Sequence, residues 1–370
     1  MAYTTIDDPT KYFNIKTYTG NLIERAVEGL GHQPDFLWFK NLDTTNSHNI
    51  LDSLRGVGEK LEGPDNENAA ASTSTRLTSF DSDGFTVKTD PSVNGQTNQM
   101  CVWSWVCNGG TNENAVAESG NNPANTRQTN TDAGFSMIIT TGTGAAGTVA
   151  HGLGAAPKLI ISKGRSDSGG WVVYHSSNTA APETDALNLS ATTSTTDAST
   201  WYNDTAPTSS VFTLGSTNDL NGNDRTYIHY VWTEKQGYSK FGGYTGNNNA
   251  NGPFIYTGFT PAFIIIKNIT DAADWTMYDD KRNPIEGNER DIQLYPNLSN
   301  AEDSVSTSTL LDICSNGFKI MGNNNKFNGD GDSMIYWAFA SAPFVTSNGG
   351  PANGSTGFTG EIIGNESSFE

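Results

Sequence analysis

Three aromatic segments of the chain alternate in the way expected of β-strands. In the first segment, Cys101, Trp103 and Trp105 share one side, because successive side chains of a strand point to opposite faces. The opposite side mixes apolar and polar residues, so we expect an antiparallel sheet with one buried and one partly solvated face. The same alternation returns in two later segments, at Ile228, Tyr230 and Trp232 and at Ile335, Trp337 and Phe339.

These segments belong to a threefold internal repeat, which is the strongest signal in the sequence. Each copy opens with a Thr-Gly stretch and approaches a proline, and an apolar segment then leads to a lysine six residues after that proline. Consecutive apolar positions predict a strand that is covered on both faces. The prolines and lysines are Pro34 and Lys40, Pro157 and Lys163, and Pro261 and Lys267.

Further blocks recur in the same order. An Asn-Gly pair precedes each aromatic segment by the same offset and predicts a turn, because both residues tolerate positive φ. Asp52, His175 and Asp279 occupy equivalent positions. Because the side chain changes among them, a structural hydrogen bond is favoured over a chemical role. The Asn-Gly pairs are Asn94-Gly95, Asn221-Gly222 and Asn328-Gly329.

The repeat predicts an all-β fold of three tandem, homologous β-sandwich or jelly-roll-like (concanavalin-like) units. The alternative is a pseudo-threefold β-prism or propeller built from all three copies. Residues 49–61 contain Gly56 and Gly58, so we expect at most a short turn of helix there. The expected parts are an N-terminal arm (1–11), repeat 1 (12–110), an Asn/Gly/Thr-rich linker (111–133), repeat 2 (134–236), repeat 3 (237–345) and a Gly/Ser-rich C-terminal tail (346–370).

Charge and composition narrow the classes of function. The 40 acidic and 21 basic residues give a net charge of −19, and no Lys/Arg cluster offsets it, which argues against nucleic-acid binding. The first nine residues have no basic or apolar region typical of a signal peptide, and the apolar runs are too short to span a bilayer. We therefore expect a soluble protein without membrane insertion.

The cysteines do not indicate a disulfide framework, because their number is odd. Cys101 and Cys107 lie six residues apart on one extended segment, which places them roughly 20 Å apart. That separation is too large for a disulfide bond. Free thiols are expected.

Two places in the chain are candidates for binding. Trp201 and Tyr202 lie outside the strand blocks, beside Asn203 and Asp204, and are the best candidates to stack on a sugar ring. Asp330 and Asp332 alternate in an oxygen-rich stretch and are candidates for binding Ca²⁺, although the stretch lacks the fixed positions of an EF-hand loop and also suits a solvated turn. No other cofactor is expected.

No catalytic motif is found. The five histidines are scattered, and the chain has no Gly-x-Ser-x-Gly, His-Glu-x-x-His or Walker sequence. We therefore expect a protein that is not an enzyme. A glycan depolymerase stays open as an alternative, because a pair of catalytic carboxylates needs no local motif.

Several blocks together carry a family resemblance that spans nearly all of the chain. They are residues 1–9, the Gly-Leu-Gly-x-x-Pro block with its apolar strand and lysine, and residues 203–209, 211–215, 237–241 and 252–259. With these blocks the chain resembles a repeated domain of unknown function that is common in virion structural proteins of marine bacteriophages, those of cyanobacteria and of abundant ocean heterotrophs. Members of that family look like tail-fibre or appendage proteins.

The resemblance implies a non-enzymatic protein of the virion surface, synthesised in the bacterial cytoplasm and involved in host attachment. The implied partners are other virion proteins, a host surface glycan or protein, and further copies of the chain, with a trimer as the first expectation. The chain has no N-terminal anchoring module and no heptad stretch of the kind that phage fibres use. We therefore expect a short appendage, a fibre tip, or a decoration protein of the capsid or tail.

Overall fold

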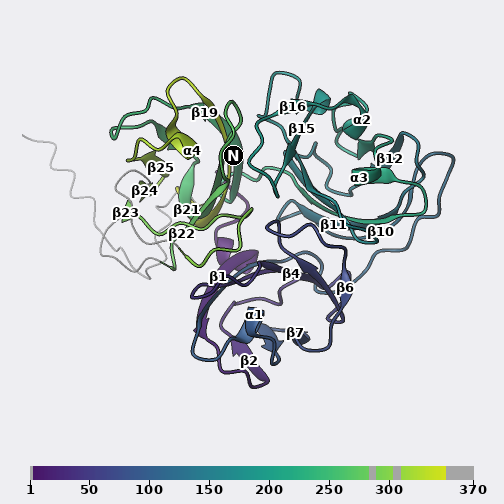
Figure 1. Cartoon of the computed structure of the whole chain (residues 1–370), viewed down its shortest axis with the longest axis horizontal. Helices are drawn as coiled ribbons and strands as arrows, with labels where there is room; N and C mark the ends of the chain where they lie inside the picture. Colours follow the sequence, from purple (N-terminus) through teal and green to yellow (C-terminus); the bar gives the residue numbers. More distant parts are fainter. Residues whose placement is uncertain (1–2, 283–288, 303–309, 347–370) are drawn as a thin grey trace, which may run out of the picture.

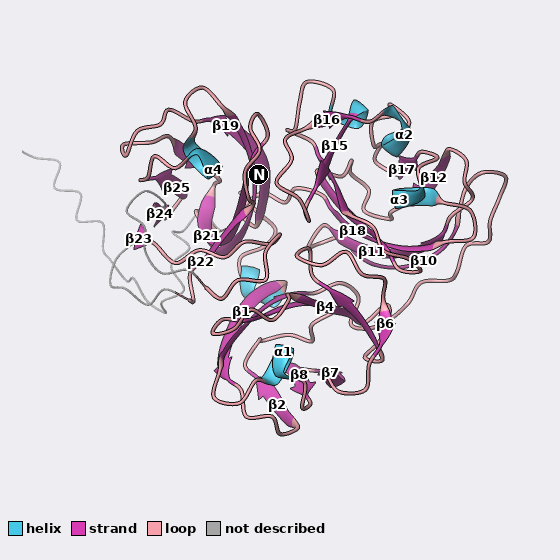
Figure 2. Ribbon diagram, in the orientation of Figure 1, coloured by secondary structure: helices cyan, strands magenta, loops and turns pink. Residues whose placement is uncertain are grey.

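The computed structural model describes residues 3–282, 289–302 and 310–346 (Figure 1). In this part of the chain strands predominate, and each helix is a single turn of three or four residues (Figure 2). Neighbouring strands pair antiparallel. The all-β class is therefore confirmed. Most of the expected C-terminal tail, from residue 347 onward, lies outside the described residues.

Each repeat forms one large sheet around the same central order of four strands. The opening strand pairs with the aromatic strand, the aromatic strand with the strand after the proline, and that strand with a fourth. In repeat 1 the sheet runs β1 (Phe13–Thr19), β9 (Gln99–Trp105), β3 (Phe36–Asn41), β4 (Asn49–Asp52), β5 (Glu59–Glu62) and β6 (Ala71–Ser72). In repeat 2 it runs β10 (Ala124–Asn130), β11 (Phe135–Thr141), β18 (Thr226–Trp232), β13 (Leu159–Gly164), β14 (Trp171–His175), β15 (Asp185–Asn188) and β16 (Thr196–Asp197). In repeat 3 it runs β19 (Ser239–Thr245), β26 (Ser333–Pro343), β21 (Phe259–Asn268) and β22 (Thr276–Asp279).

A smaller sheet covers the outer face of each large sheet, and an apolar cluster fills the space between the two. The smaller sheets are β2 (Arg25–Glu28), β8 (Gly84–Val87) and β7 (Leu77–Asp81); β12 (Gly147–Ala150) and β17 (Val211–Leu214); and β20 (Phe254–Tyr256), β25 (Gly317–Ile320), β24 (Leu311–Cys314) and β23 (Glu289–Arg290). The helices are η1 (Pro9–Lys11), α1 (Pro91–Asn94), η2 (Pro182–Thr184), α2 (Ser199–Tyr202), α3 (Asn218–Asn221) and α4 (Asn325–Asn328).

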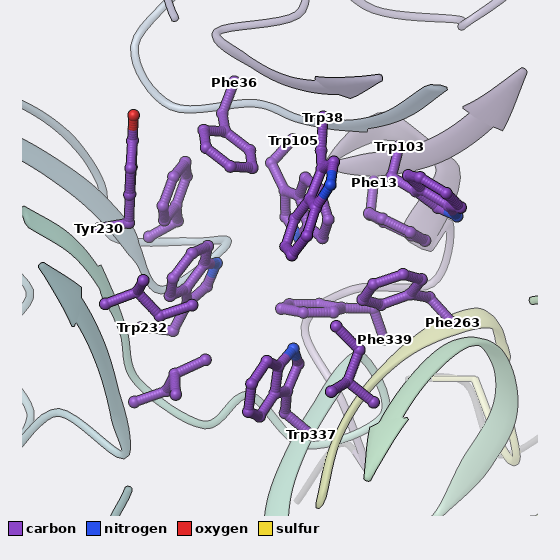
Figure 3. Close-up of a cluster of buried hydrophobic side chains, with 14 of the residues drawn as sticks. Phe13, Phe36, Trp38, Trp103, Trp105, Tyr230, Trp232, Phe263, Trp337 and Phe339 are labelled. Carbon is purple, nitrogen blue, oxygen red and sulfur yellow. The ribbon is translucent and has the colours of Figure 1, made fainter. Parts of the chain in front are cut away.

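The inner faces of the three large sheets turn toward one another and enclose a shared core (Figures 1 and 2). Three aromatic residues at equivalent repeat positions meet at its centre (Figure 3). The ring centroid of Trp105 lies 6.3 Å from that of Trp232 and 5.4 Å from that of Phe339, and the centroids of Trp232 and Phe339 are 6.4 Å apart. The core contains a cavity of only about 20 Å³, and the side chains around it are predominantly aromatic and aliphatic. This close packing joins the repeats into one body.

Each aromatic strand is therefore covered on both sides. From Met100 to Trp105 every residue of β9 is buried, and the same holds for β18 from Tyr227 to Trp232. The expectation of one partly solvated face was wrong. It treated each repeat as a free-standing sandwich, whereas the outer face packs on the smaller sheet and the inner face on the other repeats.

Each Asn-Gly pair leads into a turn, as predicted, because the carbonyl oxygen of its glycine accepts from the residue three positions on. The expected positive φ was wrong. Each pair ends a one-turn helix, and φ is −58° at Gly95, −59° at Gly222 and −58° at Gly329. The glycine of the opening Thr-Gly stretch lies against each Asn-Gly pair, and a larger residue would not fit there. A Cβ on the glycine of the opening Thr-Gly stretch would lie 2.1 to 2.3 Å from the carbonyl oxygen of the Asn-Gly glycine, in the pairs Gly20 and Gly95, Gly142 and Gly222, and Gly246 and Gly329.

Residues 49–61 contain β4, one turn in which Gly56 N donates to the Asp52 carbonyl oxygen, and the start of β5, which agrees with the expectation of at most a short helical turn. Another segment differs from expectation. The expected linker 111–133 contains β10, which pairs with β11 along seven residues and extends the large sheet of repeat 2. The three cysteines are free thiols, as expected. No helix in the described residues is long and apolar enough to cross a membrane.

Candidate functional site

The repeat lysines are buried where one repeat meets the next. Each Nζ donates to the carbonyl oxygen of the residue that follows it in sequence, at 2.8, 3.0 and 2.5 Å. Burial lowers the pKa of each lysine to about 8. Each Nζ also donates to a carbonyl oxygen of a different repeat: Lys40 to Ser299 (3.2 Å), Lys163 to Glu67 (3.1 Å) and Lys267 to Thr192 (3.3 Å).

The equivalent residues Asp52, His175 and Asp279 make a second ring of contacts between repeats. Tyr230 of repeat 2 donates its hydroxyl to Asp52 at 2.7 Å. His175 Nε2 lies 3.0 Å from the carbonyl oxygen of Tyr336 in repeat 3. Trp103 of repeat 1 donates to Asp279 at 3.2 Å, which closes the ring. The predicted structural hydrogen bonds are confirmed.

The five histidines are all buried, and both ring nitrogens of each have a hydrogen-bond partner. Burial lowers the pKa of each imidazole, to about 3 at His229 and to about 4 at His175. The histidines therefore have a structural role, because their ring nitrogens are engaged in hydrogen bonds within the protein.

Trp201 and Tyr202, the candidates for sugar stacking, lie in α2 of repeat 2. Tyr202 is only 1% exposed, and its ring packs against Tyr174 with centroids 5.5 Å apart. Trp201 is partly buried against the same apolar cluster. Tyr202 is therefore a core residue, and only Trp201 keeps an exposed part. The burial of Tyr202 follows from its position in the repeat, because Tyr202 corresponds to the buried residues Leu77 and Leu311 of the other repeats.

Asp330 and Asp332, the calcium candidates, lie in the turn after α4. Asp330 is exposed. Asp332 accepts a hydrogen bond from Asn268 Nδ2 at 2.8 Å, so one of its oxygens fixes the turn. The described residues contain no group of three or more His, Cys, Asp or Glu side chains that could hold a metal ion. Calcium binding stays a prediction.

A polar pocket of about 310 Å³ opens at one end of repeat 1, a place that sequence reasoning missed. Its walls come from the large sheet, the loop before β4, the residue before β7 and the start of α1. The lining residues are Thr45, Asn46, Ser47, Asn49, Glu62, Arg76, Asp90, Pro91 and Ser92.

Arg76 is the central charged group of this pocket. Its guanidinium lies 3.3 Å from Glu62 and 3.3 Å from Asp90, and its side chain is only 5% exposed. Two hydrogen bonds from Ser92 and the nearby Arg76 keep the pKa of Asp90 below its ordinary value, although burial acts in the opposite direction. Arg76 Nη1 and Asn49 Oδ1 are buried and have no hydrogen-bond partner in the structure.

The fold is all-β and internally repeated, and repeat 1 carries a small polar pocket. Residues 8–343 match the model of a family described as a domain of unknown function, DUF7483, and the chain belongs to that family. No curated protein and no solved structure matches the chain.

Proposed function

We propose that this protein is a non-enzymatic structural protein of a virion surface, of the appendage or fibre type, that takes part in host attachment. The observation that supports the proposal is that the buried polar groups form hydrogen bonds between the repeats. The repeat lysines and the Asp52, His175 and Asp279 ring connect the repeats to one another. Such groups build a rigid body that presents loops and open pockets, among them the polar pocket of repeat 1, which suits binding.

We further propose that the three sheet pairs are homologous, jelly-roll-like sandwich units arranged as a pseudo-threefold prism. Two kinds of contact support this arrangement. Equivalent lysines reach equivalent loops of the neighbouring repeat, and Trp105, Trp232 and Phe339 meet around one axis. One ancestral unit that once assembled as a trimer would leave this pattern after two duplications.

The partners that follow from this function are other virion proteins and a host surface glycan or protein. Several copies on a symmetric particle, with a trimer as the first arrangement to test, would convert weak single contacts into avidity. A net charge of −19 works against partners that are themselves anionic.

Two measurements test the proposal. Immunogold labelling of purified marine phage particles should place the protein on the particle surface, and the fluorescently labelled chain should adsorb to host cells. Raised thermal stability of capsids without adsorption would instead support a decoration protein. Shortened products from host polysaccharide would support a depolymerase. Absence from purified particles would overturn the virion assignment.

A further inference from the structure

We propose that the pocket of repeat 1 binds one neutral sugar residue, which would accept a hydrogen bond from Arg76 and donate hydrogen bonds to Asn49, Glu62 and Asp90. The inference rests on the proposed role in attachment and names the ligand class of that function. It places the ligand in repeat 1 and not at α2 of repeat 2, where Tyr202 is buried.

Two polar residues of the pocket, Arg76 and Asn49, are not repeated in the other two repeats. The carbonyl groups of Arg76, Trp201 and Leu310 accept equivalent backbone hydrogen bonds from the residue after β8, β17 and β25, so these three positions correspond. Asn49, Val172 and Thr276 also correspond, because each pairs with the residue just before the repeat lysine. Repeat 2 therefore has Trp and Val, and repeat 3 has Leu and Thr, where repeat 1 has Arg and Asn.

The exchange of apolar for polar residues is unfavourable for folding alone. A nearly buried guanidinium nitrogen and a buried amide oxygen without partners each cost free energy, on the order of 1–3 kcal/mol. Repeat 2, with Trp and Val, shows that the fold accepts apolar side chains at both positions. A ligand that forms hydrogen bonds with Arg76 and Asn49 would account for the presence of these two polar residues in repeat 1.

The charges of the pocket favour a neutral ligand. Arg76 lies between Glu62 and Asp90, and Lys60 is 2.8 Å from Glu62, so two positive and two negative groups balance. An anionic sugar would meet two carboxylates, and a cation would meet the guanidinium. A sugar hydroxyl can accept from Arg76 Nη1 and donate to a carboxylate or to Asn49 Oδ1. The volume of about 310 Å³ is at the small end of ligand pockets.

The pocket walls are held in place without the ligand. Lys40 Nζ donates to the carbonyl oxygens of Thr44 and Asn46 at 3.0 and 2.9 Å, which fixes the loop before β4. Asp90 accepts from the backbone and hydroxyl of Ser92 at 2.9 and 2.5 Å. A fixed wall lowers the entropy cost of binding.

Saturation-transfer NMR with methyl glycosides of glucose, galactose, mannose, fucose and N-acetylglucosamine tests the proposal, with sodium glucuronate as the anionic probe. At least one neutral glycoside should bind, and glucuronate should not. Arg76→Leu and Asn49→Val, which copy the residues of repeats 3 and 2, should each weaken binding at least 10-fold. The double variant should not bind detectably.

Arg127→Leu is the matched control, because it removes an arginine that pairs with Glu113 on repeat 2, away from the pocket. Its affinity should equal that of the parent chain. The proposal is overturned if no neutral glycoside binds, if the folded double variant binds as well as the parent, or if glucuronate binds better. Equal cell adsorption by parent and double variant would remove the pocket's role and leave attachment standing, whereas sugar binding without adsorption would do the reverse.

Discussion

Lys40, Lys163 and Lys267 are buried charges whose hydrogen bonds go to backbone carbonyl oxygens of two repeats. A buried ammonium without such partners would be strongly unfavourable. The carbonyl groups offset part of that cost, and burial still lowers the pKa of each lysine to about 8. The lysines therefore fix how the repeats fit together and do so at some expense of stability.

The pH dependence of stability tests this account. In the unfolded chain a lysine titrates near pH 10.4, whereas Lys163 in the folded protein has a pKa of about 8. Between these values the unfolded chain holds more protons, so the contribution of Lys163 to the free energy of unfolding rises with pH. Relative to Lys163→Met, the parent should gain about 2 kcal/mol from pH 8 to pH 10.

Denaturant unfolding of both proteins at pH 8, 9 and 10 measures that difference. Comparison at each pH cancels the other titrating groups, including the buried thiols whose pKa burial raises. A difference that stays constant across this range would show that Lys163 has an ordinary pKa in the folded protein.

The contact between Asp52 and Tyr230 allows a second test. Asp52 also pairs with Arg55 at 2.6 Å, and both side chains are fully buried. Asp52→Ala leaves the Arg55 guanidinium with Glu59, at 3.7 Å, as its remaining carboxylate partner and should cost about 3–5 kcal/mol. Tyr230→Phe removes two hydrogen bonds, the one donated to Asp52 and the one accepted from Arg55 at 3.3 Å, and should cost about 1–3 kcal/mol. Chemical unfolding of both single variants and the double variant measures the coupling, and additive costs would contradict a direct contact.

At the scale of elements, a single asparagine joins three segments in every repeat. Asn221 Nδ2 donates to the carbonyl oxygens of Gly215 and Ala145 at 2.9 and 2.7 Å, and its Oδ1 accepts from Thr143 N at 3.0 Å. Asn94 and Asn328 make the same three bonds in their own repeats. The amide thus ties the one-turn helix to the loop after the opening strand.

Replacing this asparagine should destabilise the protein strongly. Asn221→Ala removes three hydrogen bonds, and of the three backbone groups involved the Ala145 carbonyl keeps a bond from the Thr143 hydroxyl, so a loss of about 3 kcal/mol is expected. Asn223→Ala, in the same turn but exposed, should stay within about 0.5 kcal/mol of the parent. Thermal unfolding of the two variants measures the contrast, and similar melting temperatures would refute the role given to Asn221.

The same scale explains why Tyr202, one of the two sugar candidates, is buried. Trp201 and Tyr202 were judged exposed because they lie outside the strand blocks that the repeats share. Trp201 and Tyr202 correspond to Arg76 and Leu77. The correspondence rests on backbone hydrogen bonds, because the carbonyl oxygens of Trp201 and Arg76 accept from the residues that follow β17 and β8. Loops of different length hide that correspondence in the sequence. Arg76 itself stands between polar residues and has no local motif.

At the scale of the whole molecule, the shared core makes the repeats depend on one another. Phe263 of repeat 3 is fully buried, and its ring lies 5.8 Å from those of Phe13 and Trp103 and 5.6 Å from Trp105, all in repeat 1. A separated repeat would expose its inner aromatic face to water, which costs free energy in proportion to the area.

We therefore expect one cooperative unfolding transition for the whole chain. Phe263→Ala should cost about 3–5 kcal/mol, and it should lower the melting temperature of every repeat together. Scanning calorimetry with hydrogen-exchange mass spectrometry measures both effects. Two or three separate transitions, or faster exchange confined to repeat 3, would show that the repeats are stable on their own.

The sequence by itself determined the all-β class, the threefold repeat, the order of its strands and the free thiols. These follow from alternation, residue spacing and covalent reach, which are local properties of the chain. It also placed Asp52, His175 and Asp279 at equivalent structural positions.

Only the tertiary structure decided which faces are buried and where a ligand can enter. The inner face of β9 is covered by residues more than 100 positions away, so its burial cannot be read from its own alternation. The pocket combines β4, β5, the start of β7 and α1, and its polar character depends on what fills the same space in the other repeats. Packing between distant segments sets both features, and a local pattern does not contain that information.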